Sequence, residues 1–223
     1  MNNPPSSFRL PLAALAVAVL AAPLAMPLQA QDLDAACAAI EGSKLGDWTE
    51  QTVDSPNGPM DMRFSLVRSR GGTWYEVRAQ TSAGASILQM KVPGFPFTPA
   101  QIEEVVTKTG SSPAVRLPDA MVRQYTQTAQ TGPLGDIRKQ CLSAEVLGSE
   151  NVSVPAGTFR TTHLRFPAGS DVWVSDAVPF GIVRGEIPGQ GSMELKAHGT
   201  GAESSITGTP MDLGGGASTD SGP

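Results

Sequence analysis

The sequence has few of the side chains that carry most enzymatic and metal chemistry. Its 223 residues include only two cysteines and two histidines, and aromatic residues make up 5% of the chain. The cysteines and histidines lack the spacing of a structural zinc site, and no nucleophile-elbow motif or glycine-rich phosphate loop is present. We therefore expect a protein that is not an enzyme and that needs no metal or other cofactor.

Positive charge is also scarce. The chain has 16 lysines and arginines against 21 aspartates and glutamates, a formal net charge of −5, and no run of basic residues. Binding to nucleic acid depends on a cationic surface that neutralises phosphates. Nucleic acid is therefore not an expected partner.

A long apolar run occurs only near the N-terminus. Arg9 is the one charge before the apolar residues 10–25, and no cluster of positive charge follows them. The run is shorter than the roughly 20 residues that a membrane-spanning helix needs. We interpret residues 1–30 as a signal peptide cleaved after Ala30, with Ala25 as a second candidate position. The expected product is a periplasmic protein that does not span the membrane.

Export determines how the two cysteines are interpreted. In an oxidising compartment, a disulfide between Cys37 and Cys141 is the expected state. It would close a loop of roughly a hundred residues, for which the chain-entropy model gives a stabilisation of about 4.7 kcal/mol. Two buried, unpaired thiols are one alternative, and lipidation of Cys37 is another.

Alternation of apolar and polar side chains predicts antiparallel strands over much of the chain. Residues 60–66 alternate in this way, and Gly71-Gly72 separates them from the next predicted strand in a tight hairpin. The further predicted strands are 73–79, 87–92, 141–154 with a bend near Gly148, 158–166, 171–175, 180–186 and 192–197.

Helices are predicted in three places. Residues 32–41 are rich in alanine, and residues 98–110 begin with a Thr-Pro-Ala-Gln capping box and carry an apolar stripe. Residues 119–129 have helical spacing, although their glutamine and threonine content leaves a strand as the alternative.

The chain thus divides into the signal peptide, a single domain over residues 31–205, and a tail. The tail, residues 206–223, consists mainly of small and polar residues and is expected to be disordered. Within the domain, strands come first, a helical insert follows, and strands end the fold. This order predicts an α+β fold, an antiparallel sheet with helices covering one face, and the 93–130 segment is the large apolar candidate for that cover.

Two motifs and this element order resemble the LolA/LppX-like superfamily of exported proteins. The motifs are Val-x-x-Pro-Ala-Gly-x-Phe at 152–159 and a tryptophan strand followed by a Pro/Gly turn at 171–181. The residues that match are Val152, Pro155, Ala156, Gly157, Phe159, Trp173, Pro179 and Gly181. The resemblance implies a strongly curved half-barrel, a hollow between sheet and helices, and a partner that is a lipid or a lipoprotein acyl chain.

On this basis we expect a non-enzymatic binding or carrier protein that holds a hydrophobic ligand. The alternative is an envelope structural or protein-interaction module in which the same side chains form a solidly packed core. A hydrolase would need His163 or His198 beside an acid and a hydroxyl. The candidate ligand-binding residues are Met62, Phe64, Leu88, Met90, Phe95, Phe97, Ile102, Val105 and Val106.

The disulfide prediction can be tested on gels. We expect the purified protein to migrate differently under reducing and non-reducing conditions, because the bond between Cys37 and Cys141 keeps the denatured chain more compact. Two reactive thiols per chain in the unfolded, unreduced protein would contradict this expectation.

Overall fold

The computed structural model describes residues 28–56, 58–130 and 137–213. Residues 1–27 of the predicted signal peptide and residues 214–223 of the predicted tail lie outside this range, so these two predictions are not changed by the structure. The assignment of residues 31–205 to a single domain also stays a prediction.

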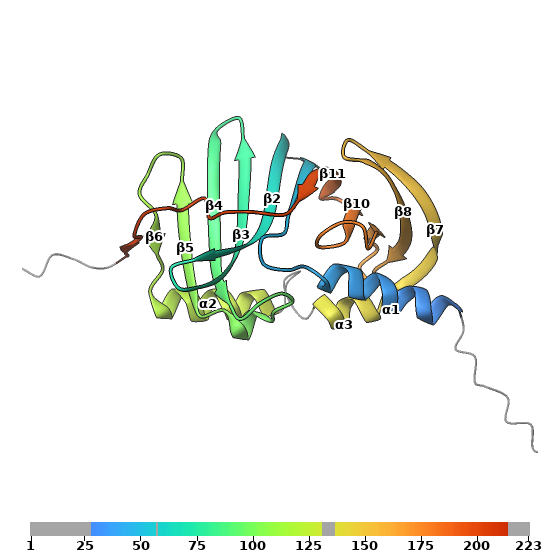
Figure 1. Ribbon diagram of the computed structural model, residues 1–223, viewed down its shortest axis with the longest axis horizontal. Coiled ribbons are helices and arrows are strands. Elements are labelled where there is room, and N and C mark those ends of the chain that lie inside the picture. The colour runs from blue at the N-terminus through green and yellow to red at the C-terminus, as the bar shows by residue number, and fades with distance from the viewer. Residues whose placement is uncertain (1–27, 57, 131–136, 214–223) are drawn as a thin grey trace, which may run out of the picture.

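The described residues form an α+β fold built on one open, mostly antiparallel sheet of twelve strands (Figure 1). The strand order is β12-β6-β5-β4-β3-β2-β1-β11-β10-β9-β8-β7. The predicted fold class is confirmed. The strands are β1 Trp48–Ser55, β2 Gly58–Ser69, β3 Gly72–Thr81, β4 Gly84–Val92, β5 Glu104–Thr109, β6 Val115–Arg116, β7 Glu145–Val154, β8 Gly157–Arg165, β9 Asp171–Val174, β10 Ile182–Ile187, β11 Gly191–Gly199 and β12 Met211–Asp212.

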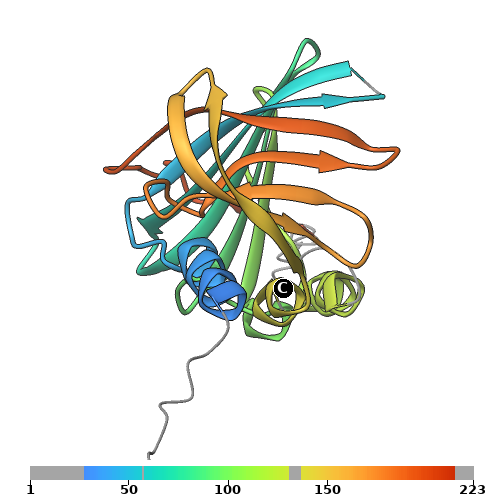
Figure 2. The same cartoon turned by 90° about the vertical axis from the view of Figure 1, so that its right-hand side faces the viewer.

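The described residues also form three α-helices, which lie along the same end of this sheet in both views (Figures 1 and 2). They are α1 Leu28–Glu41, α2 Asp119–Gln130 and α3 Ile137–Leu142. The first two were predicted, and the strand alternative for 119–129 is excluded. α2 covers β2–β5 through Val122 and Tyr125, whereas α1 and α3 pack against β8 and β9.

The pairing of β1 with β11 joins the two halves of the sheet. Its register runs from Trp48 opposite Gly199 to Asp54 opposite Ser192. β1 was not predicted, because Thr49 and Gln51 are polar although the structure buries them. A strand that places polar side chains in the interior shows no apolar alternation.

The sheet curls back on itself at the β7 edge. The β7–β8 hairpin crosses over the neighbouring strands (Figure 2), and the Ala156 N–H donates to the Leu195 carbonyl at 3.2 Å. β7 also contains the predicted bend, since its pairing with β8 is irregular between Val146 and Gly148. Residues 141–144, predicted as the start of this strand, instead belong to α3 and the turn after it.

The predicted β2–β3 hairpin is confirmed, with its turn one residue earlier than expected. Ser69 pairs with Gly72, so the loop consists of Arg70 and Gly71, both with positive φ. Arg70 lies in this unusual conformation with its guanidinium 4.0 Å from the centre of the Trp74 ring. It also donates to Gln89 Oε1 at 2.6 Å.

The predicted helix over residues 98–110 is wrong. The capping box forms, because the Thr98 N–H donates to Gln101 Oε1 at 2.8 Å, but it starts only the 3₁₀ turn η1 Pro99–Gln101. The chain then enters β5, in which Val105 and Val106 are both fully buried. Val105 packs with Met90 on the helix-covered face of the sheet, and Val106 packs on the opposite face. Two adjacent β-branched residues buried on opposite sides fit a strand covered on both faces.

The second face of β3–β5 is covered by residues 200–213, which we call the C-terminal strap. Ile206 is 3% exposed and packs with Trp74 and Val106. The carboxylate of Glu76 accepts hydrogen bonds from the Ser205 N–H at 2.9 Å and the Ser205 hydroxyl at 2.6 Å. β12 then pairs in parallel with β6.

The prediction of disorder from residue 206 is therefore wrong for residues 206–213. By composition this segment consists mostly of small and polar residues, with Ile206, Met211 and Leu213 as its large apolar side chains. Composition could not show that the sheet supplies the missing partners, a buried carboxylate and a tryptophan.

The disulfide between Cys37 and Cys141 is present, as predicted. It links α1 to α3 beside Leu164 and Val174, and both cysteines are buried. An ion pair between Arg138 and Glu41 at 2.6 Å joins the same two helices. The two helices are thus held as a unit over β8 and β9.

We expect that a chain ending at Gly199 is less stable than the full chain by at least about 2 kcal/mol, because it loses the burial of Ile206 and exposes Trp74. Urea unfolding of the two chains measures this difference. A chain ending at Leu213 is the matched control and should unfold like the full chain. Equal stability of all three would contradict the role given to the strap.

Candidate functional site

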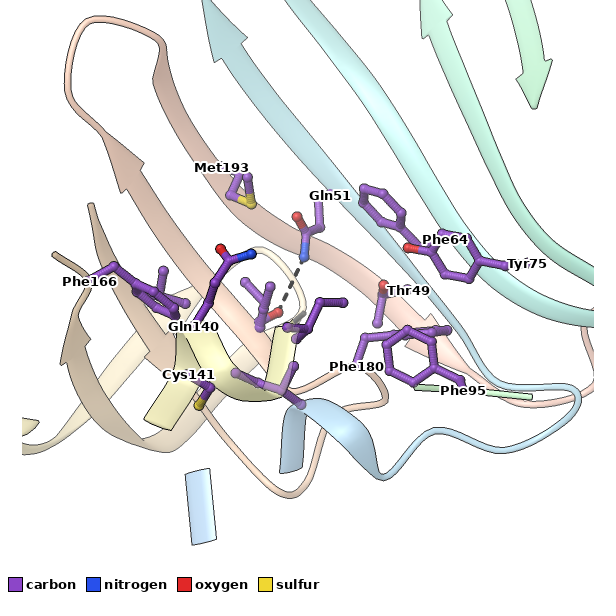
Figure 3. A pocket seen from close by; sticks show the side chains of 14 residues that line it. Thr49, Gln51, Phe64, Tyr75, Phe95, Gln140, Cys141, Phe166, Phe180 and Met193 are labelled. Atoms are coloured by element: carbon purple, nitrogen blue, oxygen red, sulfur yellow. Dashed lines mark hydrogen bonds between the residues drawn. The ribbon is translucent and has the colours of Figure 1, made fainter. Parts of the chain in front are cut away.

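An apolar cavity of about 320 Å³ lies between the sheet and the helix pair α1–α3 (Figure 3). This volume is within the lower range of small-molecule sites. The sheet provides the floor, α1 and α3 contribute from above, and three loop phenylalanines complete the wall. The lining residues are Ile40, Thr49, Gln51, Phe64, Tyr75, Phe95, Ile137, Gln140, Cys141, Phe166, Val172, Phe180, Ile182 and Met193.

Local packing explains why space remains at this position. α1 and α3 are fastened to each other and to β8 and β9, so they stand to one side of the central strands β1 and β11. α2 packs against β5 in the other half of the sheet. The central strands thus lie between two packed regions.

Aromatic rings form one wall of the cavity. Phe95 and Phe180 make an edge-to-face contact with ring centroids 5.0 Å apart, and the Tyr75 ring lies 5.8 Å from Phe95 and 6.0 Å from Phe180. Such contacts stabilise the packing of aromatic rings beyond simple burial. Burial raises the pKa of the Tyr75 hydroxyl, so this group is neutral at ordinary pH.

The turn between β9 and β10 sets the position of Phe180. The Phe180 N–H donates to the Ser43 hydroxyl at 2.6 Å, and Phe180 has a positive φ of 59°. Gly181 follows, and a Cβ on this glycine would lie only 2.9 Å from the backbone nitrogen of Ile40. A glycine is therefore needed where α1 meets this turn, and the contact directs the Phe180 ring into the cavity.

Among the described residues, the lining contains no charged side chain, but it contains two buried polar atoms without partners. Thr49 is 0% exposed and Gln51 is 3% exposed. Within the described residues, neither the Thr49 hydroxyl oxygen nor Gln51 Oε1 has a hydrogen-bond partner. The Gln51 amide nitrogen donates to the Ile182 carbonyl at 3.4 Å (Figure 3), so Oε1 is the end of the amide that stays free. An unsatisfied buried group of this kind costs about 1–3 kcal/mol.

The structure distributes the nine predicted ligand-binding residues over several places. Phe64 and Phe95 line the cavity. Val106 lies on the opposite face of the sheet, under the C-terminal strap, and Met62 is half-buried and does not line the cavity. The remaining five belong to the core under α2, namely Leu88, Met90, Phe97, Ile102 and Val105.

Most of the residues that line the cavity are not among the predicted ligand-binding residues. Thr49 and Gln51 belong to the strand that was not predicted. The predicted strands include Tyr75, Ile182 and Met193, but none of these three residues was predicted to bind ligand. The only sequence signal for this part of the lining is the polar side chain of Gln51, which lies at an inward position of β1. That signal can be recognised only once the register of β1 is known.

The two histidines have structural contacts. The His163 ring stacks on Trp173 with centroids 4.2 Å apart, and its Nε2 lies 3.1 Å from Asp171 Oδ1. Trp173 in turn donates to Glu150 at 2.6 Å. Hydrogen bonds from Arg165, with a smaller contribution from His163, hold the pKa of Asp171 below its usual range. These contacts connect β7, β8 and β9, whereas His198 packs against the Phe159 ring.

Two further kinds of feature are absent from the described residues. No cluster of three or more His, Cys, Asp or Glu side chains there could hold a metal ion. No helix in the same part of the chain has the length and apolar content needed to cross a membrane.

No protein-family model matches the chain, and no curated protein matches it in sequence. Solved structures resemble it at 12% identity. A protein described as exported, with a YmcC-like fold, from Bacteroides fragilis covers 71% of this chain and 97% of its own, with a TM-score of 0.34. A protein described as a lipoprotein from Parabacteroides distasonis covers 70% and 96%, with a TM-score of 0.33.

The structure of MucB matches 80% of this chain and 61% of its own, at 12% identity and a TM-score of 0.37. At these values the three likenesses establish neither a family nor a function for this chain.

Two threonines of the sheet allow a matched test of the unpaired hydroxyl. Thr49→Val removes a hydroxyl without a partner, so we expect stability to stay equal or to rise by up to about 1 kcal/mol. Thr161 is equally buried, but its hydroxyl donates to the Glu150 carbonyl at 2.9 Å. Thr161→Val should therefore lose about 1 kcal/mol. Urea unfolding measures both changes, and an equal loss in the two variants would show that the Thr49 hydroxyl is bonded.

Proposed function

We propose that this protein is a non-enzymatic periplasmic binding or carrier protein that holds an apolar ligand, such as a lipid or lipoprotein acyl chain, in the cavity. The observation that carries the proposal is the cavity itself. It has a volume of about 320 Å³, lies between a sheet and a disulfide-linked helix pair, and has no charged lining side chain in the described part of the chain. Such a site can bind by burial of apolar surface and needs no catalytic group.

The expected energetics are sufficient for binding. Burial of a methylene group contributes about 0.8 kcal/mol, so ten methylenes contribute about 8 kcal/mol. That value corresponds to a Kd of order 1 µM before the costs of association are subtracted. The aromatic wall formed by Phe64, Tyr75, Phe95 and Phe180 presents the flat apolar surface against which a chain can pack.

Two further observations support an exported carrier. The disulfide fits an oxidising compartment. The motifs at 152–159 and 171–181 resemble the LolA/LppX-like superfamily, and the α+β fold with helices over one face of a curved sheet has the architecture which that resemblance implies.

The second candidate is an envelope structural or protein-interaction module. It is favoured by the core under α2, where Met90 and Val105 are fully buried and pack with Val122, as a solid interior would. In this case the cavity would be an incidental packing defect, and no apolar ligand would bind.

Native mass spectrometry distinguishes the two. We expect protein purified without detergent to carry an adduct of lipid mass that organic extraction removes, and to bind a fluorescent fatty probe again afterwards. Val172→Phe places a ring in the cavity and should weaken probe binding at least tenfold. Val154→Phe adds the same ring to a half-buried strand position outside the cavity and is the control.

Absence of both adduct and probe binding in the unmodified protein would overturn the carrier proposal. Equal weakening by the two phenylalanine variants would show that the probe binds elsewhere.

A further inference from the structure

The unpaired polar atoms on the cavity floor indicate which kind of ligand end enters the site, given the proposed function. Thr49 and Gln51 are two residues apart on β1, both line the cavity, and their Cα atoms are roughly 7 Å apart in an extended strand. Figure 3 shows both between the aromatic wall on one side and Met193 and Phe166 on the other. The polar pair thus belongs to the buried floor of the cavity rather than to its rim.

The hydrogen-bonding capacity of this pair is specific. Because the Ile182 carbonyl can only accept, the Gln51 nitrogen must face it, and Oε1 is left as a pure acceptor. The Thr49 hydroxyl can donate or accept. A complementary ligand group therefore has to supply one donor to Gln51, and it can accept a hydrogen bond from Thr49.

The charge of the ligand end also follows from the lining. No lysine, arginine or histidine of the described residues lines the cavity, so a carboxylate or phosphate there would lose its hydration without gaining a counter-ion. A fully apolar end, in turn, would leave the acceptor of Gln51 unsatisfied. An uncharged hydroxyl meets both conditions.

We propose that the cavity takes a single-chain amphiphile head first, with an uncharged hydroxyl that donates to Gln51 Oε1 and accepts from the Thr49 hydroxyl. The chemical class is that of long-chain alcohols and monoacylglycerols. Gln140, which lines the same space from α3, offers a further amide to a second hydroxyl of a glycerol head.

Three probes of matched chain length test this proposal by competition against the bound fluorescent fatty probe. They are 1-decanol, which donates and accepts; 1-methoxydecane, which only accepts; and decanoate at pH 8, which is charged. We expect 1-decanol to bind at least tenfold more tightly than 1-methoxydecane, a difference of about 1.4 kcal/mol. Decanoate should bind most weakly.

Gln51→Leu and Thr49→Val should each reduce the preference for the alcohol over the ether to about twofold or less, while the ether itself still binds. Thr52→Val is the control, because Thr52 hydrogen bonds to Asp61 and does not line the cavity. It should leave the preference unchanged.

Each other outcome has a definite meaning. Equal binding of 1-decanol and 1-methoxydecane by the unmodified protein would overturn this inference and leave the carrier proposal intact, with water as the partner of the polar pair. Tighter binding of decanoate would overturn the uncharged head. Failure of every probe to bind would overturn the inference and the proposed function together.

Discussion

The antiparallel pairing of β1 with β11 is the interaction that makes one sheet out of two meanders. β1 to β5 follow one another as neighbours, as do β7 to β11, and the register between Trp48 and Gly199 joins the two sets. The strands at this junction lie between the region packed under α2 and the region packed under α1 and α3. The cavity forms over the junction, and its floor includes Thr49 and Gln51 for this reason.

The helix pair and the loops maintain the space above that junction. The disulfide and the Arg138–Glu41 ion pair hold α1 and α3 together, and the contact of Gly181 with the backbone of α1 fixes the turn that carries Phe180. Each of these contacts lies beside the cavity rather than across it. Ile40 of α1 and Ile137, Gln140 and Cys141 of α3 line the cavity together with Thr49 and Gln51 of the floor.

Much of the fold could be predicted from the sequence, whereas most of the site could not. Alternating residues such as those at 60–66 identify strands because burial on one face imposes a period of two, and the two cysteines left a single intramolecular pairing. The prediction failed where tertiary contacts override local signals. The sequence pattern predicted that Val105 and Val106 lie on one apolar stripe of a helix, yet they belong to a strand in a part of the sheet that is covered on both sides. Ile206 is ordered by partners that are far away in sequence. β1 was missed because its inward residues are polar, and these same residues mark the site.

A crystal structure of protein purified without detergent, at a resolution that shows ordered water, tests the central claim that a ligand-sized hollow lies between sheet and helices. The expected result is elongated density between Phe180 and Met193, with one end within hydrogen-bonding distance of Gln51 Oε1. Side chains of α1 and α3 packed directly against Thr49 and Gln51, with no space between them, would contradict it.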